Sequence, residues 1–197
     1  MKFKALITDL DGTLVTLPID WDRLRNEVRN LLNTDHPLRP LAPSIPEASR
    51  GNLTLIKKAF ELIEREELRA SESAEFDEEL YRFFRWIKEL GMKIGLVTLQ
   101  GRRPAERTLK RLGILKFFDS IVTREDSLIR LEQLLKSLRK LNTKPEETIF
   151  VGDSPSDVKA GKTLNLFTVT IKKRTCKPKG DLEIDKITEL RGYLEHF

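Results

Sequence analysis

Short apolar runs alternate with helical repeats of apolar residues along the chain from about residue 77 onward. Apolar runs predict buried strands, whereas apolar residues spaced three and four apart predict helices that cover them. The predicted strands are 3–7, 93–98, 120–123, 148–152 and 167–171, and the predicted helices are 80–90, 105–112, 128–141 and 155–164, with a last helix beginning near 188. This alternation is typical of an α/β fold in which helices cover a parallel sheet.

Residues 15–76 do not follow this alternation of strands and helices. Apolar residues at helical spacing predict two amphipathic helices there, over 21–32 and 53–63. Between them, prolines recur at every third position of 37–46, a spacing that favours extended polyproline geometry. We interpret 34–46 as a stiff loop between the helices, although the same spacing also suits a ligand of a peptide-binding domain. The predicted organisation is a core made of 1–14 and 77–197, with a small helical insertion, 15–76, after the first strand.

The composition of the chain argues against several classes of function. No apolar run approaches the length of a membrane span, and the N-terminus reads as a charged strand rather than a signal peptide. A single cysteine, Cys176, excludes an internal disulfide and favours a reducing cytoplasm. The formal charge of +5 is modest, and the densest basic run, 172–179, has no interleaved aromatic residues. We therefore expect a cytoplasmic protein with no nucleic-acid or membrane partner; its oligomeric state is left open.

The first predicted strand ends in two carboxylates, Asp9 and Asp11, followed by Gly12, which allows a sharp turn. Two carboxylates brought this close repel each other by about 1 kcal/mol in water and about 4 kcal/mol near a protein surface. A bound cation or a shared proton relieves that repulsion. The pattern indicates a site for a hard cation with a spare carboxylate for covalent chemistry. The alternative interpretation is an ordinary acidic turn after an edge strand.

Two more predicted strands end in polar residues. Thr98 follows the strand 93–97, and Asp153 and Asp157 follow the strand 148–152. In parallel α/β sheets the ligand site lies beyond the carboxyl ends of the strands, so these residues are expected near Asp9. Asp153 or Ser154 could instead serve only as the cap of the next helix. Capping would explain one acid but not two acidic clusters at strand ends.

These motifs resemble those of the haloacid dehalogenase-like (HAD) hydrolase superfamily, in the phosphoglycolate phosphatase-like branch with a helical C1 cap. The resemblance covers nearly the whole chain and rests on 9–14 (DLDGTL), on Thr98 after 95–97 (GLV) and on 152–157 (GDSPSD). The third motif departs from the family, which places a lysine or arginine at the start of the helix after the third strand. Residues 123–130 (TREDSLIR) contain no lysine. We assign the cationic role to Arg130, with Arg124 as the alternative.

The resemblance implies a Rossmann-like core and a phosphatase that hydrolyses a small phosphorylated metabolite through an aspartyl-phosphate on Asp9. It implies that Asp11 is the general acid and base. Mg²⁺ would be held by Asp9, the Asp11 carbonyl and Asp153, with Asp157 binding a metal water or orienting the site. The residues implied to hold the phosphoryl oxygens are Thr98, the N–H of Leu99 and Arg130.

Two other functions fit the same motifs. A phosphomutase needs the same acids, and a non-catalytic phosphate- or metal-binding regulator would inherit the fold without the activity. Asp11 itself argues for phosphate esters over carbon–halogen bonds, since displacement of halide needs no acid for the leaving group. Substrate choice is expected to depend on the insertion, where Trp21, His36 and Arg39 are the candidates.

Overall fold

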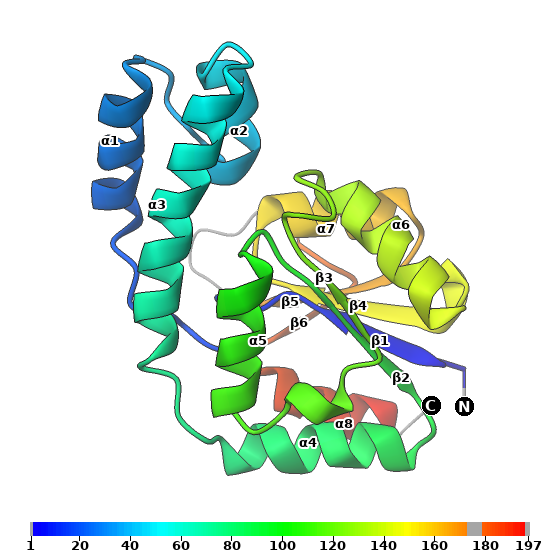
Figure 1. Ribbon diagram of the computed structural model, residues 1–197. Coiled ribbons are helices and arrows are strands. Elements are labelled where there is room, and N and C mark those ends of the chain that lie inside the picture. Colours follow the sequence, from blue (N-terminus) through cyan, green and yellow to red (C-terminus); the bar gives the residue numbers. More distant parts are fainter. Residues whose placement is uncertain (1, 173–178, 196–197) are drawn as a thin grey trace.

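A six-stranded parallel sheet forms the centre of the protein (Figure 1). The structure is a computed structural model that describes residues 2–172 and 179–195. Its strands are β1 (Ala5–Thr8), β2 (Lys93–Val97), β3 (Ser120–Val122), β4 (Thr148–Gly152), β5 (Phe167–Ile171) and β6 (Leu182–Ile184). All five pairings are parallel in the order β3-β2-β1-β4-β5-β6. The predicted α/β fold is confirmed. Cys176 and most of the basic run 172–179 lie outside the described residues.

The strand order reverses at β1, which lies between β2 and β4. Thr8, the last residue of β1, pairs with Leu96 of β2 and with Val151 of β4. The carboxyl ends of the three central strands therefore lie side by side. Such a reversal point opens a crevice beyond the strand ends, which is where ligands bind in open α/β sheets.

Helices cover both faces of this sheet because successive side chains of each buried strand point to opposite sides. Leu6 lies in an apolar cluster with α4 (Glu78–Glu89), α5 (Arg102–Arg111) and α8 (Leu190–Leu194). Its neighbour Ile7 lies in a second cluster with α6 (Arg130–Leu141) and α7 (Pro155–Thr163). Single-turn helices occur at η1 (Leu115–Phe117), η2 (Pro145–Glu147) and η3 (Ile187–Glu189).

Residues 15–76 contain three helices, α1 (Trp21–Leu32), α2 (Leu41–Ala48) and α3 (Leu53–Ser71). They have an apolar cluster of their own, whose members lie between Leu17 and Ala70. Figure 1 shows these helices standing to one side of the sheet, with α3 running beside α5. Within the described ranges, no helix has the length and apolar character needed to cross a bilayer.

The prediction of an extended loop over 34–46 is wrong for its second half, which forms the start of α2. Pro43 is the third residue of that helix, where the missing N–H costs no intrahelical hydrogen bond. The Ser44 hydroxyl donates to the Pro40 carbonyl at 2.6 Å, and Ile45 is fully buried. Burial of apolar side chains against α3 therefore outweighs the extended preference of the proline spacing. The short strand β6 was not predicted either.

Candidate active site

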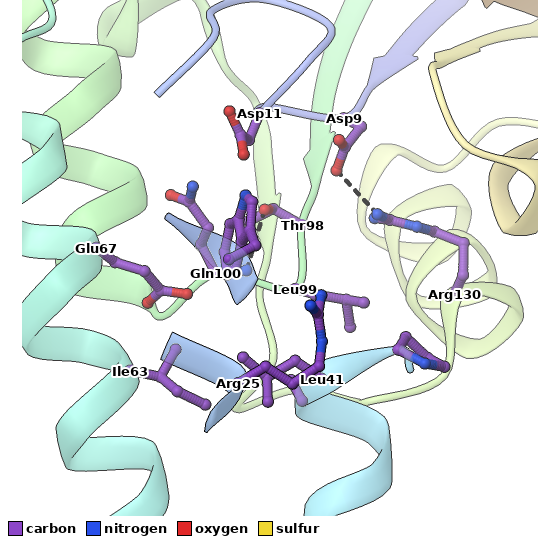
Figure 2. A pocket seen from close by; sticks show the side chains of 13 residues that line it. Asp9, Asp11, Arg25, Leu41, Ile63, Glu67, Thr98, Leu99, Gln100 and Arg130 are labelled. Atoms are coloured by element: carbon purple, nitrogen blue, oxygen red, sulfur yellow. Dashed lines mark hydrogen bonds and ion pairs between the residues drawn. The ribbon is translucent and has the colours of Figure 1, made fainter. Parts of the chain in front are cut away.

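A pocket of about 280 Å³ lies between the carboxyl ends of the central strands and the helices of residues 15–76 (Figure 2). Strand ends and helices contribute opposite walls, so the pocket exists only in the folded chain. The lining residues are Asp9, Asp11, Trp21, Arg25, Pro40, Leu41, Ala42, Ile63, Glu67, Thr98, Leu99, Gln100 and Arg130.

Asp9 directly follows β1, and its backbone N–H donates to the Val151 carbonyl of β4 at 3.0 Å. Its carboxylate is buried, and Arg130 Nη2 donates to Oδ1 at 2.9 Å. Burial raises the pKa of Asp9 to about 8, although Arg130 opposes the rise; Asp157 and Asp153 add to it. The positive charge of Arg130 therefore does not fully offset the effect of burial on this carboxylate.

Asp11 lines the same pocket, two residues further along a tight turn. Gly12 has a φ of 85°, a left-handed conformation that glycine adopts without a steric penalty. The Leu17 N–H donates to Asp11 Oδ1 at 2.9 Å, which ties the carboxylate to the start of the helical insertion. Figure 2 shows the Asp9 and Asp11 side chains at the same end of the pocket.

The segment after β4 is a helix cap as well as part of the acidic cluster. Ser154 is the N-cap of α7 and forms a capping box with Asp157, whose Oδ2 accepts from the backbone N–H of Ser154 at 3.1 Å. The other oxygen, Oδ1, lies 2.7 Å from Arg130 Nε. Asp157 therefore connects the cap of α7 to the guanidinium that contacts Asp9.

One carboxylate oxygen from each of Asp9, Asp153 and Asp157 lies within 4.8 Å of the other two. Three carboxylates share this space with one guanidinium, that of Arg130. Although burial favours its neutral form, Asp157 and Asp9 hold the pKa of Arg130 above its usual value. Oxygen donors with a surplus of negative charge are the donor set that a hard divalent cation requires. The residues present therefore fit such an ion.

The two arginines considered for the third motif occupy different places. Arg130 is the first residue of α6 and contacts Asp9 in the pocket. Arg124 instead contacts Glu67 of α3, with Nη1 at 2.7 Å from both carboxylate oxygens. The structure thus brings Arg130, and not Arg124, to the acidic cluster.

Thr98 and Leu99 line the pocket at the end of β2. The Thr98 N–H donates to the Val122 carbonyl at 3.0 Å, and the Thr98 carbonyl accepts from Gln133 Nε2 of α6 at 2.8 Å. These two bonds fix the backbone of Thr98 relative to β3 and α6. Leu99 is half-buried beside it.

Sequence analysis missed three polar pocket residues, Arg25, Glu67 and Gln100. Each lies on a helical or loop position whose direction depends on how α1, α3 and α5 dock, so no local pattern marks it. Of the candidates named for substrate choice, Trp21 lines the pocket. Arg39 is an exposed partner of Asp22, and His36 Nδ1 accepts from the Leu38 N–H at 3.0 Å. Neither of the latter two is among the lining residues.

Comparison with known proteins identifies the family. The haloacid dehalogenase-like hydrolase model matches residues 26–171. The pyrophosphatase PpaX of Bacillus mycoides (strain KBAB4) is 30% identical over 206 residues, which cover 96% of each chain. A HAD phosphatase from Thermococcus onnurineus superposes with a TM-score of 0.62 at 25% identity, covering 98% of both chains.

The β-phosphoglucomutase of Clostridium difficile superposes with a TM-score of 0.72, covering 98% of this chain and 96% of that chain. At 20% identity this likeness shows the fold alone. The family inferred from the sequence motifs is confirmed, and with it the expectation of a hydrolase. The chain belongs to the haloacid dehalogenase-like hydrolase family.

Proposed function

We propose that the chain is a phosphatase that hydrolyses a small phosphate monoester or anhydride with Mg²⁺ through an aspartyl-phosphate on Asp9. One observation supports the proposal most strongly. Asp9 Oδ1 lies 2.9 Å from Arg130 Nη2, and one carboxylate oxygen of Asp9 lies within 4.8 Å of a carboxylate oxygen of Asp153 and of Asp157. A buried carboxylate beside a guanidinium and further acids is arranged for phosphoryl transfer, which requires mainly positioning and charge neutralisation. The relatives named pyrophosphatase support a phosphorylated substrate.

In the proposed first step, an Asp9 oxygen attacks phosphorus as the bond to the leaving oxygen breaks, and Asp11 donates a proton to that oxygen. In the second step water attacks the aspartyl-phosphate, Asp11 takes a proton from the water, and phosphate leaves with Asp9 restored. The position of Asp11 in the pocket, anchored by the Leu17 N–H at 2.9 Å, supports this role.

The cation would be held by Asp9, the Asp11 carbonyl and Asp153. It would neutralise the negative charge gathered by these groups and the substrate phosphoryl, and so favour the ionised form of Asp9. Because Asp157 has one oxygen in the cap of α7 and the other beside Arg130, we assign it the orienting role.

Thr98, the Leu99 N–H and Arg130 are proposed to bind the phosphoryl oxygens. All three residues line the pocket, and Arg130 brings a charge-assisted donor to the same point as Asp9. We further propose that residues 15–76 are a cap domain over a core of 1–14 and 77–197. The separate apolar cluster between Leu17 and Ala70 supports this division.

A phosphomutase or a non-catalytic regulator would use the same fold. The placement of both Asp9 and Asp11 in one pocket favours hydrolysis over regulation, since binding alone requires no acid beside the leaving oxygen. The test is hydrolysis of 4-nitrophenyl phosphate and inorganic pyrophosphate with added Mg²⁺ and after chelation. We expect turnover only with the metal; equal rates in both conditions would remove the proposed metal role, and no turnover would favour the regulator.

A further inference from the structure

Gln100 has a buried carboxamide without a hydrogen-bond partner. The residue is only 4% exposed and lines the pocket, and among the described residues neither its Nε2 nor its Oε1 has a partner. Buried amides are normally satisfied, because leaving one unpaired costs the free energy of its desolvation. An unpaired amide that faces a pocket is therefore suited to a ligand.

The backbone on both sides of this side chain is fixed by other residues. The Gln100 N–H donates to Thr98 Oγ1 at 3.1 Å, and the Gly101 N–H donates to Glu67 Oε2 at 3.1 Å. The backbone that carries the side chain is thus held in place by bonds that do not involve the carboxamide. Figure 2 shows the Gln100 carboxamide and the Asp11 carboxylate facing the same space. Gln100 therefore lies in the same part of the pocket as Asp11, the residue proposed to protonate the leaving oxygen.

Arg25 of α1 enters the pocket from the opposite wall. Its Nε donates to the Leu38 carbonyl at 3.1 Å, and its Nη1 contacts Asp22. Among the described residues its Nη2 has no hydrogen-bond partner, and the side chain is 13% exposed. Its partner Asp22, which Arg39 also contacts, is 78% exposed, so solvent screens this ion pair and Arg25 keeps positive charge at this wall whether or not Arg39 is present.

The rest of this wall carries no free charge. Trp21, Leu41, Ala42 and Ile63 line it, and Glu67 is neutralised by its ion pair with Arg124. A short uncharged spacer fits against these side chains, whereas an anionic group fits only near Arg25.

We propose that Gln100 and Arg25 form the leaving-group subsite of the pocket and select small phosphate compounds whose leaving group has an oxyanion of its own. Gln100 donates to an oxygen of the leaving group beyond the bridging oxygen, and Arg25 binds the distal oxyanion, a carboxylate or a second phosphate. The proposal rests on the phosphatase function proposed above. Arg25 and Gln100 thereby determine specificity, and neither takes part in the chemical step.

The experiment compares inorganic pyrophosphate, 2-phosphoglycolate and 4-nitrophenyl phosphate, whose leaving groups are a phosphate, a carboxylate-bearing alcohol and an uncharged phenol. For Arg25→Gln we expect the ratio of kcat/KM on an anionic substrate to kcat/KM on the aryl phosphate to fall about 10- to 100-fold. The matched control is Arg39→Gln, which removes the same charge from the same partner outside the pocket. It should leave the ratio unchanged.

Gln100→Leu should raise KM for the anionic substrates without lowering the melting temperature, because the lost carboxamide has no protein partner. A structural role would instead lower the melting temperature and depress all three activities equally. Loss confined to pyrophosphate would identify a second phosphate as the distal group, and loss confined to 2-phosphoglycolate would identify a carboxylate.

Equal losses on all three substrates, or the same ratio change in Arg39→Gln, would overturn the subsite while leaving the phosphatase function intact. If the wild type hydrolyses none of them, the phosphatase function fails, and calorimetric binding of pyrophosphate then decides the subsite. Binding weakened by Arg25→Gln but not by Arg39→Gln would support it. Binding that is absent or the same in all three proteins would overturn it.

Discussion

Glu67 of α3 and Arg124 of the loop after β3 form a buried ion pair, with 2.7 Å from Arg124 Nη1 to each carboxylate oxygen. The side chains are 2% and 5% exposed. The Glu67 carboxylate also accepts from the Gly101 N–H, next to Gln100. One residue of the helical insertion is therefore attached to the loops that follow both β2 and β3. Because this contact lies beside the pocket, it couples the position of α3 to the shape of the site.

Glu67→Gln is expected to change how stability depends on pH. Burial raises the pKa of Glu67 to about 7 although Arg124 opposes the rise, so between about pH 4.5 and 7 the folded state holds a proton that the unfolded state releases. This group therefore lowers the free energy of unfolding as pH rises through that window, by at most about 3 kcal/mol. Gln does not titrate, so the wild type should lose stability relative to the variant with rising pH.

Urea denaturation of both proteins at pH 5, 6, 7 and 8 measures this difference. Glu61→Gln, on an exposed position of the same helix, is the control and should follow the wild type throughout. Parallel curves for wild type and Glu67→Gln would show that the carboxyl group titrates normally.

Asp9→Asn should abolish turnover, because the amide is a poor nucleophile toward phosphorus. The fold should remain, since a neutral side chain at this buried position avoids the desolvation of a charge. Activity on 4-nitrophenyl phosphate and circular dichroism measure the two effects. Asp35→Asn, at an exposed position, serves as the control. Full activity in Asp9→Asn would exclude Asp9 as the nucleophile.

Arg130→Ala is expected to lower kcat/KM about 10²- to 10³-fold, the usual cost of removing a donor that stabilises a developing oxyanion. Inhibition by inorganic phosphate should weaken in parallel, and Arg130→Lys should restore part of both through its charge. Arg124→Ala leaves Glu67 without its partner and should mainly lower the melting temperature. If Arg124→Ala weakens phosphate inhibition and Arg130→Ala does not, the two assignments must be exchanged.

Gly152→Ala tests the close approach of β4 to the cap of α7. A Cβ at this position would lie 2.6 Å from Asp157 Cβ and 2.8 Å from its Cγ, so Asp157, which contacts Arg130, must shift. We expect a loss of about 1–3 kcal/mol in unfolding free energy, together with reduced activity. Gly192→Ala, in α8 with open space around it, should leave activity unchanged. Unchanged stability in Gly152→Ala would show that the loop adapts freely.

Most of the sheet and the acidic motifs could be predicted from the sequence, because both depend on residues that are close together in the chain. A buried strand requires only a short apolar run, so five of the six described strands, β1–β5, were predicted within a residue or two. The strand β6 was missed because it has three residues, of which only Ile184 is buried. The helix α2 was missed for a different reason: its prolines favour extended structure, and only contact with α3 makes the helical alternative more stable.

Arg130 shows which part of the site follows from the local sequence and which part depends on tertiary packing. Its place near the start of the helix after β3 follows from local periodicity, and the resemblance to the family suggested it as the cation. Its contacts with Asp9 and Asp157 depend on how α6 and α7 lie against the sheet. The same sequence pattern offered Arg124, six residues earlier, and only the docking of α3 gives that residue a different partner.

The amino-acid sequence by itself determined the fold class, the family and the acids expected near one another, because strand periodicity and short motifs depend on neighbours within a few residues. Only the tertiary structure decided which side chains line the pocket opposite these acids. Arg25, Glu67 and Gln100 come from separate elements, and their directions result from the packing of α1, α3 and α5 against the strand ends. Packing of this kind depends on residues distant in the chain, for which no local pattern exists.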